Sequence, residues 1–157
     1  MAIKRDCQWS LGIIKVLLAC TLLSGYSPAR AESRAAGVAI DWQQPGTQLF
    51  ERAQRLNKLV FVNLTAEWCQ VCKKMEQTTY SDANVIAYIA EHLVAARVSD
   101  EDHGELAQRY RNHARPATVI LNADAAEILH KRGYLNAQLM QWMMAAVVAN
   151  PSPEAHR

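Results

Sequence analysis

Residues 59–76 read LVFVNLTAEWCQVCKKME, and the fold depends on the transition inside this stretch. Its first part, 59–65, is an apolar and β-branched run that is typical of a buried strand. The part that follows, 69–79, reads as a helix that begins at two cysteines, Cys69 and Cys72. The sequence therefore predicts a strand that leads into a helix with two thiols in its first turn.

The position of Cys69 at the start of a helix predicts a reactive thiol. Free backbone N–H groups and the helix dipole concentrate positive potential at a helix N-terminus, and this potential favours the thiolate. Cys72 lies one turn further on the same side of the helix, where its thiol can attack a mixed disulfide formed by Cys69. A Cys-x-x-Cys pair beside a strand–helix–strand pattern is typical of a redox-active dithiol.

Two cysteines at this spacing also have other uses. A structural zinc site needs two further ligands, and the histidines of the chain are scattered without paired spacing. A c-type haem needs a histidine at position 73, where the chain has Lys73. A copper-binding module stays open as an alternative because thiolates suit cuprous ions, and so does an inert structural disulfide.

The remaining elements are predicted from apolar periodicity and turn residues on either side of this stretch. Helices are expected over 47–57, 81–92, 104–111 and 136–149, and strands over 93–98, 117–121 and 127–131. The turn at 122–124 joins the last two strands into a hairpin. This order predicts an α/β fold, with a central mixed sheet flanked by helices on both faces.

The composition indicates a globular protein. The chain has 157 residues, of which 50% are hydrophobic and 20% are charged, and this length suits one packed domain. Its net charge of +2 gives no reason to expect nucleic acid as a partner. Four basic residues against Asp6 give residues 1–31 a net charge of +3, which leaves −1 for the rest of the chain.

Residues 1–31 have the three parts of a secretory signal peptide. A basic segment over 1–15 is followed by a short apolar run over 16–23, and the small residues Ala29 and Ala31 suit a cleavage site. We expect cleavage after Ala31 and a periplasmic mature protein. Of the four cysteines, the mature chain then keeps only the pair in the predicted helix.

Two other fates of the N-terminal segment stay open. It can remain as an uncleaved membrane anchor, although the apolar run is shorter than the ~20 residues that span a bilayer. The sequence 17–20, LLAC, also resembles a bacterial lipobox, in which Cys20 is acylated and becomes the new N-terminus. All three fates place the folded domain outside the cytoplasm.

The rest of the chain divides into three parts. Residues 32–46 are small and polar and are expected to form a flexible lead-in. Residues 47–149 are expected to form the folded domain, so that the lead-in is an N-terminal extension to it. Residues 150–157 are expected to be a disordered tail.

The chain resembles the thioredoxin-like family at two separate segments. FVNLTAEWCQVCKKME, at 61–76, resembles the active-site segment of that family, and ARPATVI, at 114–120, resembles its cis-proline segment. The nearest group is the C-terminal periplasmic thioredoxin-like domain of the DsbD-type transmembrane disulfide reductases. That group shares the Cys-x-x-Cys-Lys-x-x-Glu pattern that ends here at Glu76, and the likeness covers residues 45–148. The resemblance implies a thioredoxin fold.

The resemblance also implies roles for individual residues. Cys69 is implied to be the nucleophile and Cys72 the resolving thiol. Pro116 is implied to be a cis proline that faces the cysteines, where it removes an N–H donor near the sulfurs. The backbone of Arg115 could pair with an extended substrate segment by β-augmentation. Trp68 is expected to shield one side of the cysteine pair.

The sequence departs from the family at one position that affects proton transfer. Thioredoxins carry a buried aspartate six residues before the first cysteine, and the chain has Asn63 there. An asparagine cannot take a proton from Cys72, so Glu76 is the candidate base, one turn beyond it on the helix. The alternative is that Glu76 is a solvated surface carboxylate. Between the cysteines, 70–71 carry no charge that stabilises the reduced form, and this favours a reductant or an intermediate potential.

Taken together, these patterns predict an exported, monomeric protein-disulfide reductase that uses no metal or organic cofactor. Its expected substrates are oxidised cysteines in exported proteins. Because the chain has no site for a nicotinamide or a flavin, a membrane or periplasmic redox protein is expected to donate its electrons. A disulfide oxidase or isomerase, and a non-catalytic module that binds copper or a client protein, remain the alternatives.

Overall fold

The predicted strand-to-helix transition forms as β1 (Leu59–Leu64) followed by α2 (Gln70–Thr78). This is a computed structural model, and it describes residues 39–156. The other elements, in chain order, are α1 (Thr47–Leu56), α3 (Ala83–His92), β2 (Leu93–Val98), α4 (Glu105–Arg109), β3 (Ala117–Leu121), β4 (Glu127–Arg132), α5 (Ala137–Ala149) and a short 3₁₀ helix, η1 (Pro153–His156). The predicted elements are therefore present, with ends that differ by a few residues.

The four strands form one mixed sheet in the order β2-β1-β3-β4. β1 and β2 are parallel, whereas β3 is antiparallel to both β1 and β4. Leu64 at the end of β1 pairs with Ala117 at the start of β3. The loop that carries the cysteines and the loop that carries Pro116 therefore lie at the same end of the sheet.

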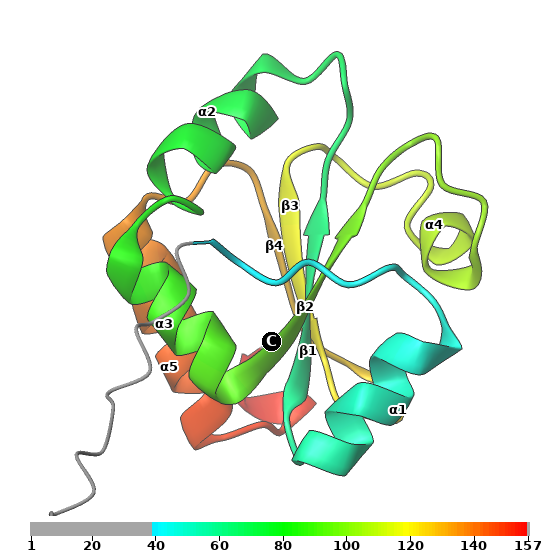
Figure 1. The fold of residues 1–157 in the computed structure, drawn as a ribbon, viewed down its shortest axis with the longest axis vertical. Coiled ribbons are helices and arrows are strands. Elements are labelled where there is room, and N and C mark those ends of the chain that lie inside the picture. The colour runs from blue at the N-terminus through cyan, green and yellow to red at the C-terminus, as the bar shows by residue number, and fades with distance from the viewer. Residues whose placement is uncertain (1–38, 157) are drawn as a thin grey trace, which may run out of the picture. The chain divides into compact units, whose positions relative to one another are not determined.

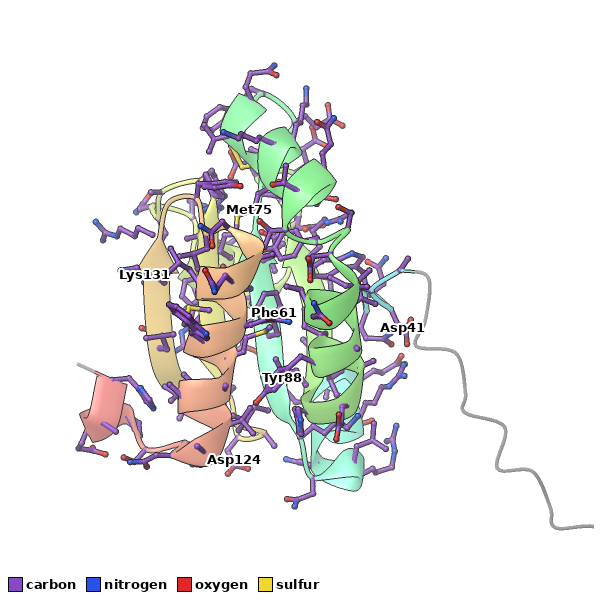
Figure 2. All side chains as sticks on the ribbon, turned by 90° about the vertical axis from the view of Figure 1, so that its left-hand side faces the viewer. Asp41, Phe61, Met75, Tyr88, Asp124 and Lys131 are labelled. Carbon is purple, nitrogen blue, oxygen red and sulfur yellow. A yellow bond between two sulfur atoms is a disulfide. The ribbon has the colours of Figure 1, made fainter. Side chains whose placement is uncertain are left out.

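Helices cover both faces of the sheet, as the sequence predicted (Figure 1). On one face, α3 and α5 pack on a core that includes Phe61, Ile120 and Met75 of α2 (Figure 2). On the other face, α1 and α4 pack on a core that includes Val62 and Val119. Alternate residues of β1 and β3 enter opposite cores because successive side chains of a strand point to opposite faces.

The start of α3 shows how local sequence sets a helix boundary. Asp82 adopts an extended conformation, and its Oδ1 accepts hydrogen bonds from the backbone N–H groups of Asn84, at 2.9 Å, and Val85, at 3.1 Å. These bonds satisfy two donors that a helix leaves free at its first turn. Asp82 is therefore the N-cap of α3.

The lead-in differs from the flexible segment that we expected at 32–46. Within its described part, Gln43 forms a bridge with Ala96 of β2, and its N–H donates to the carbonyl of Ala95 at 2.8 Å. The ring of Trp42 packs edge-on against Tyr80 at 5.4 Å between centroids. Burial of the apolar side chains of this segment stabilises an ordered conformation, which the small and polar composition of 32–46 does not predict.

The C-terminal tail also differs from the expected disorder at 150–157. Residues 153–156 form η1, which contacts β4, and a ring nitrogen of His156 lies 2.6 Å from the carbonyl oxygen of Asn150. The predicted signal peptide at 1–31, with its cleavage site after Ala31 and the alternative lipid anchor at Cys20, lies outside the described residues. Within residues 39–156, no helix combines the length and hydropathy needed to cross a membrane.

Candidate active site

The two cysteines form a disulfide at the first turn of α2. Cys69 is the N-cap of the helix, and its Sγ accepts a hydrogen bond from the backbone N–H of Cys72 at 3.1 Å. The Cα atoms of the pair are 5.2 Å apart, and the two residues are only 4% and 3% exposed. The first turn of α2 contains no acidic residue. The N-terminal potential of the helix therefore acts on the Cys69 sulfur without an opposing charge from that turn.

Trp68, directly before the pair, projects into solvent and is held at its indole nitrogen. It is 69% exposed, and Nε1 donates a hydrogen bond to Oδ2 of Asp100 at 3.1 Å. Asp100 lies just after β2. Asp100 thus holds the indole ring of Trp68. The sequence did not predict this contact, because the two residues are 32 positions apart.

The side chain of Arg115 is turned into the protein. It is 3% exposed, and its Nη2 lies 2.8 Å from Oδ1 of Asp100. Nε donates to the carbonyl of Thr65 at 3.1 Å, and Nη1 donates to the carbonyl of His113 at 2.8 Å. The guanidinium is therefore fully engaged within the protein, which leaves the backbone of this residue as the part that can meet a substrate.

The peptide bond between Arg115 and Pro116 is cis. The carbonyl of Pro116 accepts a hydrogen bond from the N–H of Gly133 at 2.8 Å, which ties this loop to the end of β4. Gly133 has a φ of +88°, a conformation that side-chain-bearing residues rarely adopt. The loop is fixed on both sides, by the Arg115 side chain and by this bond.

Glu76, the candidate base for Cys72, forms an ion pair with Arg97. Nη2 of Arg97, from β2, lies 2.7 Å from its Oε1 and 2.8 Å from its Oε2. Both side chains are about one-third exposed. The guanidinium also stacks on the ring of Trp42, at 4.7 Å from the centroid. Strand alternation places Arg97 on the face that α2 covers, which is the signal that could have identified it.

A buried polar row crosses the sheet beneath α2. Asn63 of β1 is paired with Arg97 of β2 on one side and with Thr118 of β3 on the other. Asn63 and Thr118 are buried, and so is Tyr80, which follows α2 and lies close to Thr118. Burial raises the pKa of Tyr80, and the hydroxyl of Thr118 partly offsets this effect. At position 63 the chain has an asparagine in place of the aspartate of thioredoxins. The neighbouring Arg97 forms an ion pair with Glu76, so a carboxylate is still present in this part of the fold.

A second group of titratable side chains lies beside α4, away from α2. The rings of His113 and His130 are 4.8 Å apart between centroids, and the hydroxyl of Tyr110 donates to Oε2 of Glu127 at 2.7 Å. Burial lowers the pKa of His130; His113 and Arg132 act in the same direction, and Glu127 opposes them. Nowhere in residues 39–156 do three or more His, Cys, Asp or Glu side chains gather as a metal ion requires.

A cavity of about 370 Å³ opens beside Trp68, and the other residues that line it come from the segment 99–115. Trp68, Asp100, Arg115 and His113 contribute to its lining. Its volume lies at the lower end of the range of small-molecule pockets. It lies directly beside the residue that precedes Cys69.

Comparison with known proteins agrees with this geometry. A family model named Thioredox_DsbH, described as a protein of unknown function (DUF255), matches residues 26–142. Thiol:disulfide interchange protein DsbD of Yersinia pestis (strain Pestoides F) is 28% identical over 90 residues, which are 54% of this chain and 15% of that protein. Human spermatogenesis-associated protein 20 is 24% identical over 71 residues, which are 45% of this chain and 9% of that protein. The chain thus spans a small part of the curated relatives that it matches.

Solved structures show the same fold. A structure titled DsbH oxidoreductase superposes with a TM-score of 0.64 at 16% identity, over 81% of this chain and 96% of that one. A thioredoxin from Thermus thermophilus gives 0.59 at 25% identity, over 69% and 88%. The C-terminal domain of DsbD from Neisseria meningitidis, in the oxidised form, gives 0.50 at 17% identity, over 62% and 89%. The predicted thioredoxin fold and the DsbD-like resemblance are confirmed.

Proposed function

Because this chain belongs to the Thioredox_DsbH family of thioredoxin-like thiol–disulfide oxidoreductases, we propose that it reduces disulfide bonds in exported proteins. The observation that carries the proposal is the Cys69–Cys72 disulfide, buried at the first turn of α2 with the Cys72 N–H directed at the Cys69 sulfur. In the reduced protein the same N–H and the helix N-terminus favour a thiolate at Cys69. Cys69 is thereby assigned as the nucleophile.

The proposed reaction has two exchange steps. The Cys69 thiolate attacks one sulfur of a substrate disulfide, the substrate S–S bond breaks, and the departing substrate thiolate takes a proton from water. The Cys72 thiolate then attacks the Cys69 sulfur, which breaks the mixed disulfide and releases the substrate as a dithiol. The substrate gains two electrons, and the protein is left with the Cys69–Cys72 disulfide that the structure describes.

Glu76 is proposed as the group that receives the proton of Cys72 before the second step. Cys72 and Glu76 are four residues apart on α2, so they lie on the same face of the helix. Asn63 cannot take this proton, because its side-chain amide does not act as an acid or a base. This assignment also requires Arg97 to release or share the carboxylate during the step, since both oxygens contact its Nη2.

A substrate segment is proposed to bind between Trp68 and the backbone at Arg115 and Pro116. Trp68 offers a large exposed apolar surface next to Cys69. The inward position of the Arg115 side chain leaves its main chain available for β-augmentation by an extended polypeptide. Such a site recognises backbone and therefore suits many different oxidised proteins.

We place the working protein in the periplasm as a monomer, with a folded domain that includes 47–149. Support comes from the signal-like sequence of residues 1–31. The second half of the proposed cycle needs an electron donor, and a membrane or periplasmic dithiol protein supplies the right chemistry. A metal or an organic cofactor has no part in these steps.

The direction of exchange is tested by the reduction potential of the pair. We expect the pair to equilibrate with glutathione or dithiothreitol buffers at a potential well below that of strong oxidants, because residues 70–71 add no charge that stabilises the thiolate. A potential near about −120 mV would contradict the reductase and favour an oxidase.

A further inference from the structure

Asp100 uses both of its carboxylate oxygens on two donors that come from different parts of the site. Oδ2 accepts from Nε1 of Trp68 at 3.1 Å, and Oδ1 pairs with Nη2 of Arg115 at 2.8 Å. Trp68 precedes the redox pair, and Arg115 precedes the cis proline. One side chain thus connects the two loops between which the substrate is proposed to bind.

The connection is rigid on the Arg115 side. The guanidinium is 3% exposed, and besides Asp100 it binds the carbonyls of Thr65, Tyr110 and His113 at 3.1, 3.3 and 2.8 Å. A planar group with this many bonds has one orientation. The buried guanidinium of Arg115 therefore fixes the orientation of the Asp100 carboxylate. Through its hydrogen bond to Nε1, this carboxylate in turn fixes the exposed indole ring of Trp68.

We propose that Asp100 is a positioning residue for substrate binding: it keeps Trp68 at a fixed distance from the Arg115–Pro116 loop, and so sets the width of the groove that receives an extended polypeptide. This inference rests on the proposed function. A cavity of about 370 Å³ is lined by Trp68, Asp100 and Arg115, the three residues that this connection joins. An ordered groove avoids the entropic cost of fixing Trp68 when the substrate arrives.

An Asp100→Asn substitution separates this role from a general effect of charge. A carboxylate presents two acceptor oxygens, whereas an amide presents one oxygen and an NH₂ group. The asparagine can satisfy Trp68 or Arg115, but its NH₂ then faces the other donor. The bond that is lost is the one to the exposed indole, because leaving the buried guanidinium unpaired costs more.

The experiment compares Asp100→Asn, Trp68→Phe and the double variant with the wild-type protein. Trp68→Phe keeps an aromatic ring and removes the N–H donor. Glu101→Gln is the matched control, since it makes the same change of charge at the neighbouring exposed residue. Each form is assayed with a peptide that contains a disulfide and with the small aromatic disulfide DTNB, which has no polypeptide to occupy the groove.

We expect Asp100→Asn to raise KM for the peptide about fivefold, the size of one hydrogen bond in binding, and to leave the rate with DTNB within about twofold. Trp68→Phe should raise KM for the peptide to a similar extent, and the double variant should lose no more than either single one, because both substitutions remove the same bond. Equal peptide KM values for Asp100→Asn and Glu101→Gln, or additive losses in the double variant, would overturn the inference. If the wild-type protein reduces neither disulfide, the proposed function itself fails.

Discussion

The carboxylate of Glu76 and the guanidinium of Arg97 form an ion pair in which one nitrogen, Nη2, lies 2.7 Å from Oε1 and 2.8 Å from Oε2. Glu76 stands one turn after Cys72 on α2, and Arg97 comes from the neighbouring strand β2. Arg97 therefore fixes the orientation of the carboxylate that the sequence nominates as a base for Cys72.

This pair predicts that both partners affect the second exchange step. In the reaction with DTNB, attack by Cys69 releases one coloured thiolate and attack by Cys72 releases the other, so the two steps appear as separate phases. We expect Glu76→Gln to slow the second phase about 100-fold, at the low end for general acid–base catalysis, and Arg97→Gln to slow it as well. The first phase should stay within about twofold of wild type.

The control for this prediction is Arg52→Gln, which removes another arginine paired with a carboxylate, that of Asp41 at 2.9 Å. Its phases should match those of the wild type. A normal second phase in Glu76→Gln would show that the carboxylate is not the base. Because the pair is about one-third exposed, its loss should lower the free energy of unfolding by only about 1 kcal/mol or less.

The environment of His130 predicts a loss of stability in mild acid. Burial is the main reason that its pKa lies below its usual range, which means that folding favours the neutral ring. The stabilisation is complete above the unfolded-state pKa of about 6.5 and is lost as the pH falls through the lower pKa of the folded protein. Urea unfolding at about pH 7.5 and about pH 5.5 should show a lower free energy at the acid end.

His130→Gln should reduce this difference, and the exposed His103→Gln should leave it unchanged. The groups around His130 must be considered together. His113 and Arg132 add to the lowering and Glu127 opposes it, so Glu127→Gln should steepen the pH dependence. An unchanged slope in His130→Gln would assign the acid sensitivity to other groups.

The cap of α3 gives a prediction about stability alone. Asp82→Ala removes the acceptor of two backbone N–H groups and should lower the free energy of unfolding by about 1 kcal/mol. Ser81→Ala removes a hydroxyl that only donates to the carbonyl of Gln77, and its cost should be smaller. Thermal unfolding of the two variants provides the comparison, and an equal or reversed order would contradict the assignment of Asp82 as the cap.

The signal-peptide proposal predicts the N-terminus of the mature protein. Intact-mass measurement of the protein recovered from the periplasm of an expressing bacterium should fit a chain that begins at Glu32. A lipid-modified chain that begins at Cys20 would show the lipoprotein alternative, and a full-length chain in the membrane fraction would show the anchor.

Local patterns in the sequence were sufficient to predict most of the fold. The apolar run that became β1, the cap at Asp82 and the turn before β4 are each encoded within a few neighbouring residues. The lead-in was predicted less well, because the packing of Trp42 on Tyr80 depends on residues almost 40 positions apart along the chain. No local pattern reports such a contact.

The same limit applies to the site. Cys69 and Cys72 could be identified because their spacing and their place at a helix start are local features. Asp100 could not be identified in this way, since its partners come from loops before α2 and before β3 that meet only in the folded sheet. For the same reason, the sequence could not decide whether Glu76 is a base or a solvated surface carboxylate. Its partner, Arg97, lies on β2, far from α2 along the chain.

The measurement that tests the central claim most directly is reduction of insulin by dithiothreitol in the presence of the wild-type protein, Cys69→Ser and Cys72→Ala. The wild-type protein should accelerate insulin reduction, Cys69→Ser should have no activity, and Cys72→Ala should lose turnover while it accumulates a mixed disulfide with insulin that a non-reducing gel resolves. If the wild-type protein and both variants give the same rate, and no mixed disulfide forms, Cys69 and Cys72 are not a catalytic pair.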